Sequence, residues 1–467
     1  MKQYFEKSMA KRLVEGGVWA FSAKAGSGFL TIALTALVTR MLPPKDVGLF
    51  FLSFSAIAIL SLFARFGLDQ LGIKLIGKGL VANDLQAVKL LTIRILILVG
   101  SLTVIWSVVT FLTFDYFSVR FFGEYNISHL FEKLFILWLI VTTIQIMFSE
   151  IFRSFQRIGY ASIFAGGTAF GGFSAGLLSM SIILSLYFLQ VEVSLELLLS
   201  VIIAATSVFL IIEVVLIIRM LQFKGKKNEC SNTVCGATYK DLLSRGTYFF
   251  VINLSLFSLV HADIIILGFY RPAEEVAIYA ATTRLVKLVT MSLIVIYEVV
   301  APVVVELNSE NKKKQLQRVL RLAATIAAIP TSLVLILFIF KSSVLLGYLY
   351  GEYYKEGVNI VIILSVGQLV NVWSGLSNYT LSITGFHKVN MYIVSFVAIV
   401  AIICCLFYVK EHGAYAVALI ISTAWIVQSI MAVLLTRYLV GVWTPAGVFF
   451  SLKELKRYLS IKKGLPG

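Results

Sequence analysis

About twelve apolar segments, each long enough to cross a lipid bilayer as a helix, follow one another along this chain of 467 residues. A bilayer core requires about 20 apolar residues per spanning helix, because backbone N–H and C=O groups cannot be left unpaired in hydrocarbon. A single apolar run could belong to a buried helix of a soluble protein, but such a series could not. The sequence therefore predicts an all-α integral membrane protein with about 12 transmembrane helices.

The spans predicted in the first half of the chain cover residues 17–41, 47–72, 90–114, 133–152, 161–188 and 195–219. Those predicted in the second half cover residues 247–270, 276–304, 320–340, 358–381, 391–409 and 414–436. Composition agrees with this class, since hydrophobic residues make up 59% of the chain and charged residues only 14%, against roughly 25% in soluble domains.

A net charge of +16 could indicate a partner that is a nucleic acid. The distribution of the basic residues along the chain decides between this and a membrane topology signal. With both termini placed in the cytoplasm, about 28 of the 40 Lys and Arg residues fall on cytoplasmic loops and tails and about 8 on the opposite side. This asymmetry is the positive-inside pattern of membrane proteins. The basic balance therefore indicates topology, and we expect no nucleic-acid partner.

An internal repeat divides the chain into two halves. The sequence FGEY at 122–125 returns as YGEY at 350–353, and LPPKDVGLF at 42–50 pairs with RPAEEVAIY at 271–279. The two pairs have nearly the same offset, close to half the chain length. We therefore predict two parallel six-helix bundles, related by an axis along the membrane normal. Parallel halves with a polar site between them are the plan of an alternating-access transporter.

The predicted organisation has four parts. Residues 1–221 form the N-terminal six-helix bundle, residues 222–246 a polar cytoplasmic linker, and residues 247–436 the C-terminal six-helix bundle. Residues 437–467 form a cytoplasmic tail whose leucines alternate with basic residues, a pattern typical of an interfacial helix on anionic lipid.

Enzymes and metal proteins are disfavoured by the motifs that the sequence lacks. A membrane glycosyltransferase or polymerase needs catalytic acids on a sizeable external loop, yet the longest external connections predicted here have only about 17 to 20 residues. Nothing resembles a nucleophile elbow, a Walker loop or a metalloprotease motif. The cysteine pairs Cys230 with Cys235 and Cys404 with Cys405 have no accompanying ligand pair. We therefore predict a protein that is not an enzyme and has no metal site.

Three stretches of the chain carry a resemblance to a known family. They are LVTRMLPPKDVGLFFLSFSAIAILSLFARFGLDQLGIKLIGKG, ADIIILGFYRPAEEVAIYAATTRL and YLYGEYYKEGVNIVIILSVGQLV. They resemble polysaccharide-repeat flippases of the multidrug/oligosaccharidyl-lipid/polysaccharide exporter superfamily. The likeness runs over nearly the whole chain, and its motifs are loose combinations of glycine, proline and charge at helix ends.

The resemblance implies a twelve-helix, V-shaped pair of bundles around a central cavity. It also implies a substrate made of a sugar repeat linked through pyrophosphate to undecaprenol, which the protein moves from the cytoplasmic to the outer leaflet of a bacterial inner membrane. This step would serve the synthesis of O-antigen, capsule or exopolysaccharide. Besides this substrate and membrane lipid, it implies a polysaccharide polymerase and a chain-length regulator as partners. No cofactor is implied, although coupling to H⁺ or Na⁺ is open. The alternative is a cation-coupled multidrug exporter of the same superfamily.

Lys24 is the first candidate substrate ligand, because it lies inside the first predicted span about eight residues from its start, roughly 12 Å deep. An unpaired charge there costs about 2.5 to 3.5 kcal/mol on insertion scales. Facing the cavity, Lys24 could pair with a pyrophosphate or an acidic sugar. The alternative is a structural pair with Asp69 or Asp263. In the repeat, Lys24 corresponds to Asn253, which we also assign to substrate binding.

Arg284 and Lys287 share a face of the eighth predicted helix, since they are three residues apart. Together with Lys24 they would form a cationic cavity wall. Asp263 in the seventh helix lies at a depth comparable to that of Arg284, which predicts a buried pair of these two charges. Asp263 and His261 are also candidates for binding a coupling proton or sodium ion.

Arg65 and Asp69 have the spacing of an internal helical pair near the cytoplasmic end of the second span. We assign them to structure or gating at the cytoplasmic mouth rather than to substrate binding. Glu213 is expected near a cytoplasmic helix end, where contact with solvent would make its charge tolerable. The glycine-rich run GGTAFGGFSAG at 166–176 is expected to allow close packing or bending of the fifth helix.

Overall fold

The computed structural model describes residues 26–82, 84–122, 128–165, 169–222, 238–289 and 310–447, with short stretches at 296, 300, 303–304 and 307–308. These described residues form helices and contain no β-strand. After the apolar helix Gly26–Met41, the first half of the chain forms a series of helices. They are α2 (Pro44–Arg65), α3 (Leu68–Val81), α4 (Leu85–Phe122), α5 (His129–Ser154), α6 (Ile158–Ile163), α7 (Phe173–Phe188) and α8 (Leu195–Leu221).

The second half of the chain forms a corresponding series. Its elements are α10 (Tyr239–Tyr270), α11 (Ala273–Val289), α13 (Lys313–Tyr350), the 3₁₀ helix η1 (Glu352–Gly357), α14 (Val358–Trp373), α15 (Ser377–Leu381), the π-helical turn η2 (Ser382–Phe386) and α16 (His387–Leu439).

Polar side chains at the helix starts explain where several of these elements begin. Ser128 accepts a hydrogen bond from the backbone N–H of Phe131 at the start of α5, and Ser194 does so from Leu197 at the start of α8. Thr238 opens α10 with a reciprocal capping box. Such caps satisfy backbone donors that have no partner within the helix.

The predicted all-α membrane architecture is confirmed. Seven of the described helices are long and apolar enough to cross a membrane, or eight if the bent helix α10 is counted as one span. The helices Gly26–Met41 and Phe173–Phe188 are apolar but shorter. Each of the twelve predicted spans contains a described helix, which is consistent with a twelve-helix arrangement.

Two predicted spans are each divided into two helices in the structure, which the apolar pattern of the sequence did not predict. The span predicted at 47–72 ends at Arg65, because Phe66 and Gly67 both have positive φ values, 47° and 70°, and α3 starts as a separate helix. The span predicted at 161–188 is divided into α6, which ends at Ile163, and α7, which begins at Phe173. Among the described glycines of the run, Gly171 has a φ of 79° and lies with Gly172 before α7, so the predicted bending is an interruption of the helix there.

Helix α16 contains the two last predicted spans, which Gly413 separates with a φ of 56° inside a continuous helical run. The backbone N–H of Ala414 donates to Glu275 Oε1 of α11 at 2.6 Å, and Arg271 Nε contacts the other carboxylate oxygen of Glu275 at 2.6 Å. This polar cluster attaches the turn between the two spans to the start of α11.

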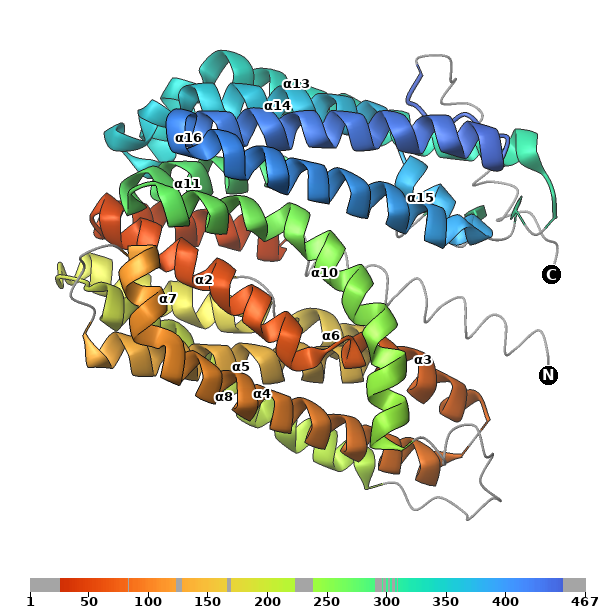
Figure 1. Ribbon diagram of the computed structural model, residues 1–467, viewed down its shortest axis with the longest axis horizontal. Helices are drawn as coiled ribbons and strands as arrows, with labels where there is room; N and C mark the ends of the chain where they lie inside the picture. The colour runs from red at the N-terminus through yellow and green to blue at the C-terminus, as the bar shows by residue number, and fades with distance from the viewer. Residues whose placement is uncertain are drawn as a thin grey trace.

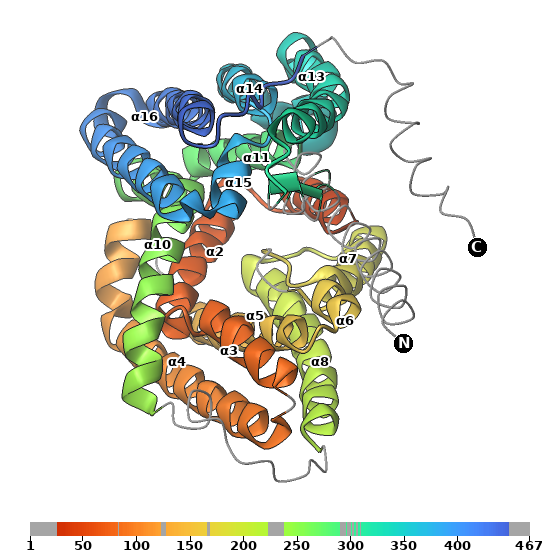
Figure 2. The same cartoon turned by 90° about the vertical axis from the view of Figure 1, so that its right-hand side faces the viewer.

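The helices form two groups, with α2 to α8 in one and α11 to α16 in the other (Figures 1 and 2). Helices α2 and α11, which are equivalent in the sequence repeat, pack against each other between the groups. Helix α10 contacts α3 and α4 of the first group and α16 of the second, and it bends by 64° between Ser255 and Val260. These three helices therefore form the boundary between the two halves.

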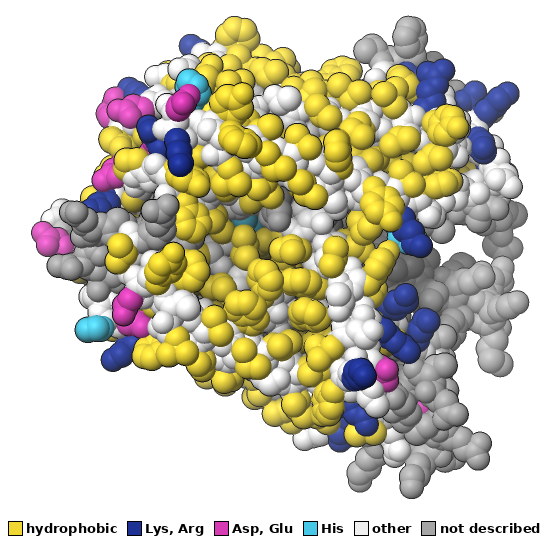
Figure 3. Space-filling view, in the orientation of Figure 1, with side chains coloured by type: hydrophobic (Ala, Val, Ile, Leu, Met, Phe, Trp, Pro, Cys, Tyr) yellow, Lys and Arg dark blue, Asp and Glu magenta, His cyan; other side chains and the backbone are white. Residues whose placement is uncertain are grey.

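The surface agrees with insertion in a membrane. Figure 3 shows a broad hydrophobic band between two charged ends, with Lys and Arg side chains at both ends and most Asp and Glu side chains of that face at one of them. Large apolar side chains such as Leu112 and Phe340 are exposed, at 74% and 79%. The predicted positive-inside orientation would place the end with few acidic side chains on the cytoplasmic side.

Gly48 allows the close packing of α2 on α11, because a Cβ at this position would lie 1.7 Å from the carbonyl oxygen of Ala273. We predict that Gly48→Ala lowers the free energy of unfolding by about 1 to 3 kcal/mol through overpacking. Gly100→Ala is the matched control, because a Cβ on Gly100 in α4 meets nothing within 4 Å. Thermal unfolding of the purified variants in detergent measures both, and equal stability would contradict the packing described here.

Candidate functional site

A cavity of about 200 Å³ lies at the boundary between the two halves. Its walls come from the helix Gly26–Met41, α2, α10 and α11, with Ala169 between α6 and α7. Most of the lining is apolar. The polar side chains that line it are Thr31, Ser55, His261, Thr283, Arg284 and Lys287. Three of the predicted site residues are therefore brought together: His261, Arg284 and Lys287.

Arg284 of α11 reaches across the boundary to the first half of the chain. The centre of its guanidinium group lies 3.8 Å from the ring centroid of Phe51 and 5.5 Å from that of Phe54, both in α2. These are cation–π contacts, which offset part of the loss of hydration of the cation. Arg284 Nη1 is buried and has no hydrogen-bond partner among the described residues. A donor of this kind is available to a ligand.

Asp263 is paired with Tyr279 and Lys287, and the predicted pair with Arg284 is wrong. The Tyr279 hydroxyl donates to Asp263 Oδ2 at 2.9 Å, and Lys287 Nζ lies 3.9 Å from the same oxygen. Lys287 also donates to the carbonyl oxygen of Val260 at 2.9 Å. The physical reason is the rotation of α11: the side chains of Tyr279 and Lys287 contact the same oxygen of Asp263, while the guanidinium of Arg284 lies against Phe51 of α2.

Asp263 itself is only 1% exposed and does not line the cavity, whereas His261 does. The imidazole of His261 stacks on Phe257 at 4.5 Å between centroids and meets Phe54 edge-on at 5.8 Å. Its Nδ1 atom is buried without a hydrogen-bond partner in the described part of the chain. The described residues contain no group of three or more His, Cys, Asp or Glu side chains that could hold a metal ion.

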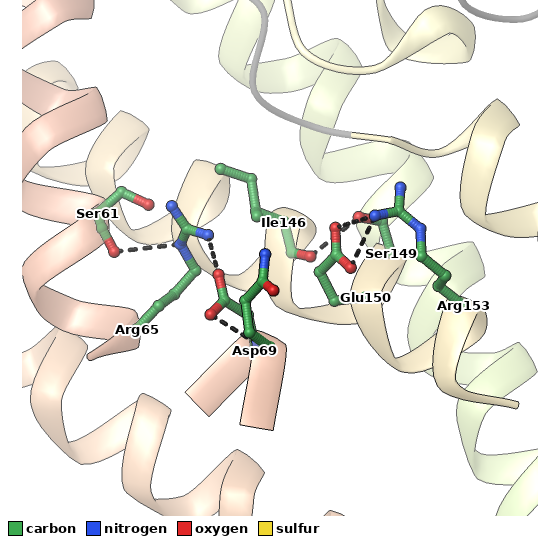
Figure 4. A network of polar contacts seen from close by, with 8 residues as sticks. Ser61, Arg65, Asp69, Ile146, Ser149, Glu150 and Arg153 are labelled. Carbon is green, nitrogen blue, oxygen red and sulfur yellow. Dashed lines mark hydrogen bonds and ion pairs between the residues drawn. The ribbon is translucent and has the colours of Figure 1, made fainter. Parts of the chain in front are cut away.

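Arg65 and Asp69 form the predicted internal pair, at 2.5 Å between Arg65 Nη1 and Asp69 Oδ2 (Figure 4). Both side chains are buried, at 8% and 6% exposure. Arg65 Nε also donates to the carbonyl oxygen of Ser61 at 3.3 Å, and Asp69 Oδ1 accepts from the backbone N–H of Gln70 at 2.8 Å. Neither residue lines the cavity. These contacts support the structural interpretation of the pair, at the junction of α2 and α3.

Three further residues singled out in the sequence are not among the described residues that line the cavity. Lys24 lies outside the described residues, so its assignment stays a prediction. Asn253 lies on α10, partly buried, and does not line the cavity. Glu213 was expected to contact solvent, and this is wrong: it is 0% exposed, and neither carboxylate oxygen has a hydrogen-bond partner within the described chain. Helix α5 packs against α8, the helix that carries Glu213. The position of Glu213 along its helix does not predict this contact.

The sequence analysis missed Phe51 and Tyr279. A usable signal existed for Tyr279, because Tyr279, Thr283 and Lys287 recur at i, i+4 and i+8 and so form one polar stripe along α11. No comparable signal existed for Phe51, since it stands in a continuous run of aromatic and apolar residues.

Comparison with known families now adds to this geometry. A family profile described as "Polysaccharide biosynthesis protein" matches residues 13–308, more than half of the chain. The chain belongs to this polysaccharide biosynthesis protein family. No curated protein matches it.

Solved structures show the fold of this family member to be that of MOP-superfamily transporters. An inward-facing multidrug resistance MATE family transporter has a TM-score of 0.67 at 14% identity, covering 96% of this chain and 100% of its own. An outward-facing one has a TM-score of 0.61 at 16% identity, covering 92% and 96%. A MOP superfamily transporter from Pyrococcus furiosus, described by a reverse polarity of its binding pocket, has a TM-score of 0.59 at 15% identity, covering 92% and 96%.

The hydrogen bond from Tyr279 to Asp263 gives a testable stability difference. Tyr279→Phe removes this donor from a buried carboxyl group, so we predict a loss of about 1 to 3 kcal/mol in the free energy of unfolding. Tyr354→Phe is the control, because Tyr354 is equally buried, at 1% exposure, and its hydroxyl has no partner among the described residues. Thermal unfolding of both variants checks the difference, and a larger loss for Tyr354→Phe would refute the assignment.

The burial of the Arg65 pair gives a second comparison. Arg65→Gln leaves Asp69 buried without its counter-charge, for which we predict a loss of about 3 to 5 kcal/mol. Arg153→Gln removes the other arginine of Figure 4 from its pair with Glu150, at 3.0 Å and 48% exposure, and should cost less than about 1 kcal/mol. Denaturant unfolding in detergent measures both, and similar losses would mean that the first pair is hydrated.

Proposed function

We propose that this protein is a flippase that moves undecaprenyl-pyrophosphate-linked oligosaccharide repeats across a bacterial inner membrane by alternating access. Its product would serve the synthesis of O-antigen, capsule or exopolysaccharide. In this proposal both termini are cytoplasmic and the protein carries out no covalent chemistry. A polysaccharide polymerase and a chain-length regulator are its proposed partners in the membrane, and nucleic acid is not a partner.

The observation that carries the proposal is the charge of the cavity wall. Arg284 and Lys287 line the cavity, while no Asp or Glu is found among its described lining residues. Arg284 has an unused buried donor, and an arginine guanidinium forms paired hydrogen bonds with phosphate oxygens. A pyrophosphate headgroup therefore suits this wall, and an organic cation does not. Membership of the polysaccharide biosynthesis family supports the same class of substrate.

The contacts suggest how binding would be linked to movement of the two halves. Arg284 belongs to the second half and rests on Phe51 of the first, so a phosphate that engages Arg284 alters a contact between the halves. Near the end of the helix Gly26–Met41, Arg40 donates to the carbonyl oxygens of Tyr348 and Leu349 at the end of α13. This second contact between the halves would close the outer side. Opening it while the substrate is bound would complete the cycle.

Asp263 and His261 are the residues that we propose for binding a coupling ion. Asp263 already shares its carboxylate with Tyr279 and Lys287, and His261 has a free Nδ1 at the cavity. A phosphate that attracts Lys287 would weaken the contact of Lys287 with Asp263 and leave this carboxylate to bind H⁺ or Na⁺. Asp263 and His261 therefore stay our candidates for coupling.

A multidrug exporter is the alternative, because two of the structural neighbours above are multidrug resistance transporters. Their identity to this chain is only 14% and 16%, which speaks for a shared fold. An exporter of cations requires carboxylates that face the cavity, and the described lining offers cations instead. We therefore place this alternative second.

Headgroup translocation in proteoliposomes tests the proposal. The substrate is a fluorescent undecaprenyl-pyrophosphate oligosaccharide, and the variants are Arg284→Gln and Lys287→Gln. We predict that each lowers the initial rate at limiting substrate about tenfold or more, because a hydrogen bond to a charged group contributes about 1.5 to 3 kcal/mol. Arg284→Lys should retain part of the rate, since it keeps the charge.

Arg318→Gln and Lys388→Gln are the matched controls, because both side chains are exposed and neither lines the cavity. They should transport like the wild type. Monodisperse elution of each variant separates loss of transport from loss of folding. If the wild type extrudes a cationic dye and does not move the lipid, the flippase proposal fails and the exporter alternative replaces it.

A further inference from the structure

Two cavities adjoin each other at the end of α16, and the side chain of Trp443 lines both. The first, which we name the apolar groove, has a volume of about 470 Å³. It is lined mainly by Leu369, Val370, Trp373, Ile430, Val433 and Leu434. The second, which we name the arginine pocket, has a volume of about 310 Å³ and is lined by Gln317, Arg437, Gly441, Val442 and Trp443. Together they form one amphipathic site. It shares no lining residue with the central cavity.

A segment without regular secondary structure, which follows α16, holds Trp443 in place at the two cavities. We name residues 440–447 the strap, since they follow α16 and lie across the helices of the second half. The backbone N–H of Trp443 donates to Gln317 Oε1 at 2.9 Å, and that of Ala446 donates to the carbonyl oxygen of Trp373 at 3.0 Å. The Thr444 hydroxyl is 2.6 Å from that of Ser377. The site is therefore a fixed part of the fold.

The arginine pocket is positively charged and its main cation is available. Arg437 is exposed, and its guanidinium contacts the ring of Trp443 at 4.9 Å. Its guanidinium forms no ion pair or hydrogen bond with the side chains and carbonyl groups of the described residues. Lys313 borders the pocket, since a Cβ built on Gly441 would lie 3.3 Å from Lys313 Nζ. The described lining contains no carboxylate to neutralise these charges.

The apolar groove faces outward rather than into the bundle, because Ile430 and Leu434 in its wall are 49% and 56% exposed. Trp373 and Trp443 mark the boundary between the groove and the polar end of the protein, and tryptophan is enriched where membrane meets water. Basic pockets beside membrane helices at this level bind anionic lipid headgroups. The chain's own residues 448–467 match this charge poorly, since they carry Lys453, Lys456, Arg457, Lys462 and Lys463 against a single acid, Glu454.

We propose that this amphipathic site binds one anionic phospholipid from the membrane leaflet that adjoins the arginine pocket. The lipid phosphate lies in the arginine pocket against Arg437, and one acyl chain lies in the apolar groove along α14 and α16. The bound lipid ties the strap to the bundle. This proposal does not depend on what the central cavity transports.

Native mass spectrometry of the purified full-length chain tests the proposal. Palmitoyl-oleoyl phosphatidylglycerol, palmitoyl-oleoyl phosphatidylcholine and inorganic phosphate are each added to delipidated protein. We expect one phosphatidylglycerol to bind in preference to phosphatidylcholine, and inorganic phosphate not to replace it. Arg437→Gln should weaken the binding of phosphatidylglycerol about fivefold, the effect of one basic residue near the surface.

Two matched variants separate this site from a general effect of charge or surface. Arg318→Gln removes an exposed arginine from the neighbouring helix α13, outside both cavities, and should leave binding unchanged. Ile430→Trp fills the groove and should abolish the preference, whereas Ile403→Trp, at nearly the same exposure of 48%, should not. Leu434→Trp replaces Ile430→Trp if the latter is not monodisperse.

Three results would overturn the proposal. Equal losses in Arg318→Gln and Arg437→Gln would mean attraction by overall surface charge. Tight binding of inorganic phosphate alone would mean a phosphate site without a lipid. Binding that appears only after deletion of residues 448–467 would mean that the chain's own tail occupies the groove.

Discussion

The fold has to place positive charges inside a protein that lies in hydrocarbon, and it does so with different partners for each charge. Lys287 shares the carboxylate of Asp263 with the hydroxyl of Tyr279. No acid of the described residues forms an ion pair with Arg284, whose guanidinium rests on the face of Phe51. Within the described part of the chain one carboxylate, that of Asp263, faces these two cations, so the described cavity wall keeps an excess of positive charge. An anionic ligand would supply the negative charge that balances these two cations.

The position of α11 decides where these charges lie, and several contacts fix it. Its start is held by the cluster of Arg271, Glu275 and the backbone N–H of Ala414. Its first turn lies directly against α2, which Gly48 permits. Because α11 packs on α2 of the other half, a change in the angle between the halves changes the environment of Arg284 directly. The same helix therefore carries the charge and the contact through which the charge could control movement.

The sequence predicted the helical membrane architecture well, because runs of apolar residues report directly on burial in lipid. It also predicted the pair of Arg65 and Asp69, whose partners are four residues apart and depend only on local geometry. It failed for Asp263 and Glu213. Their partners and their burial depend on how α10 and α11, or α5 and α8, are rotated against each other, and depth along a helix contains no information on rotation. The 64° bend of α10 further changes depths that were counted along a straight helix.

The central claim is that the cavity selects a pyrophosphate, and equilibrium binding tests it most directly. The wild-type protein in nanodiscs is titrated with an undecaprenyl-pyrophosphate-linked oligosaccharide, and a cationic dye is then added as a competitor. The account predicts binding of the anionic lipid that weakens with salt, is reduced in Arg284→Gln and is not displaced by the dye. Binding of the dye to the wild type, together with unchanged binding of the lipid in Arg284→Gln, would contradict it.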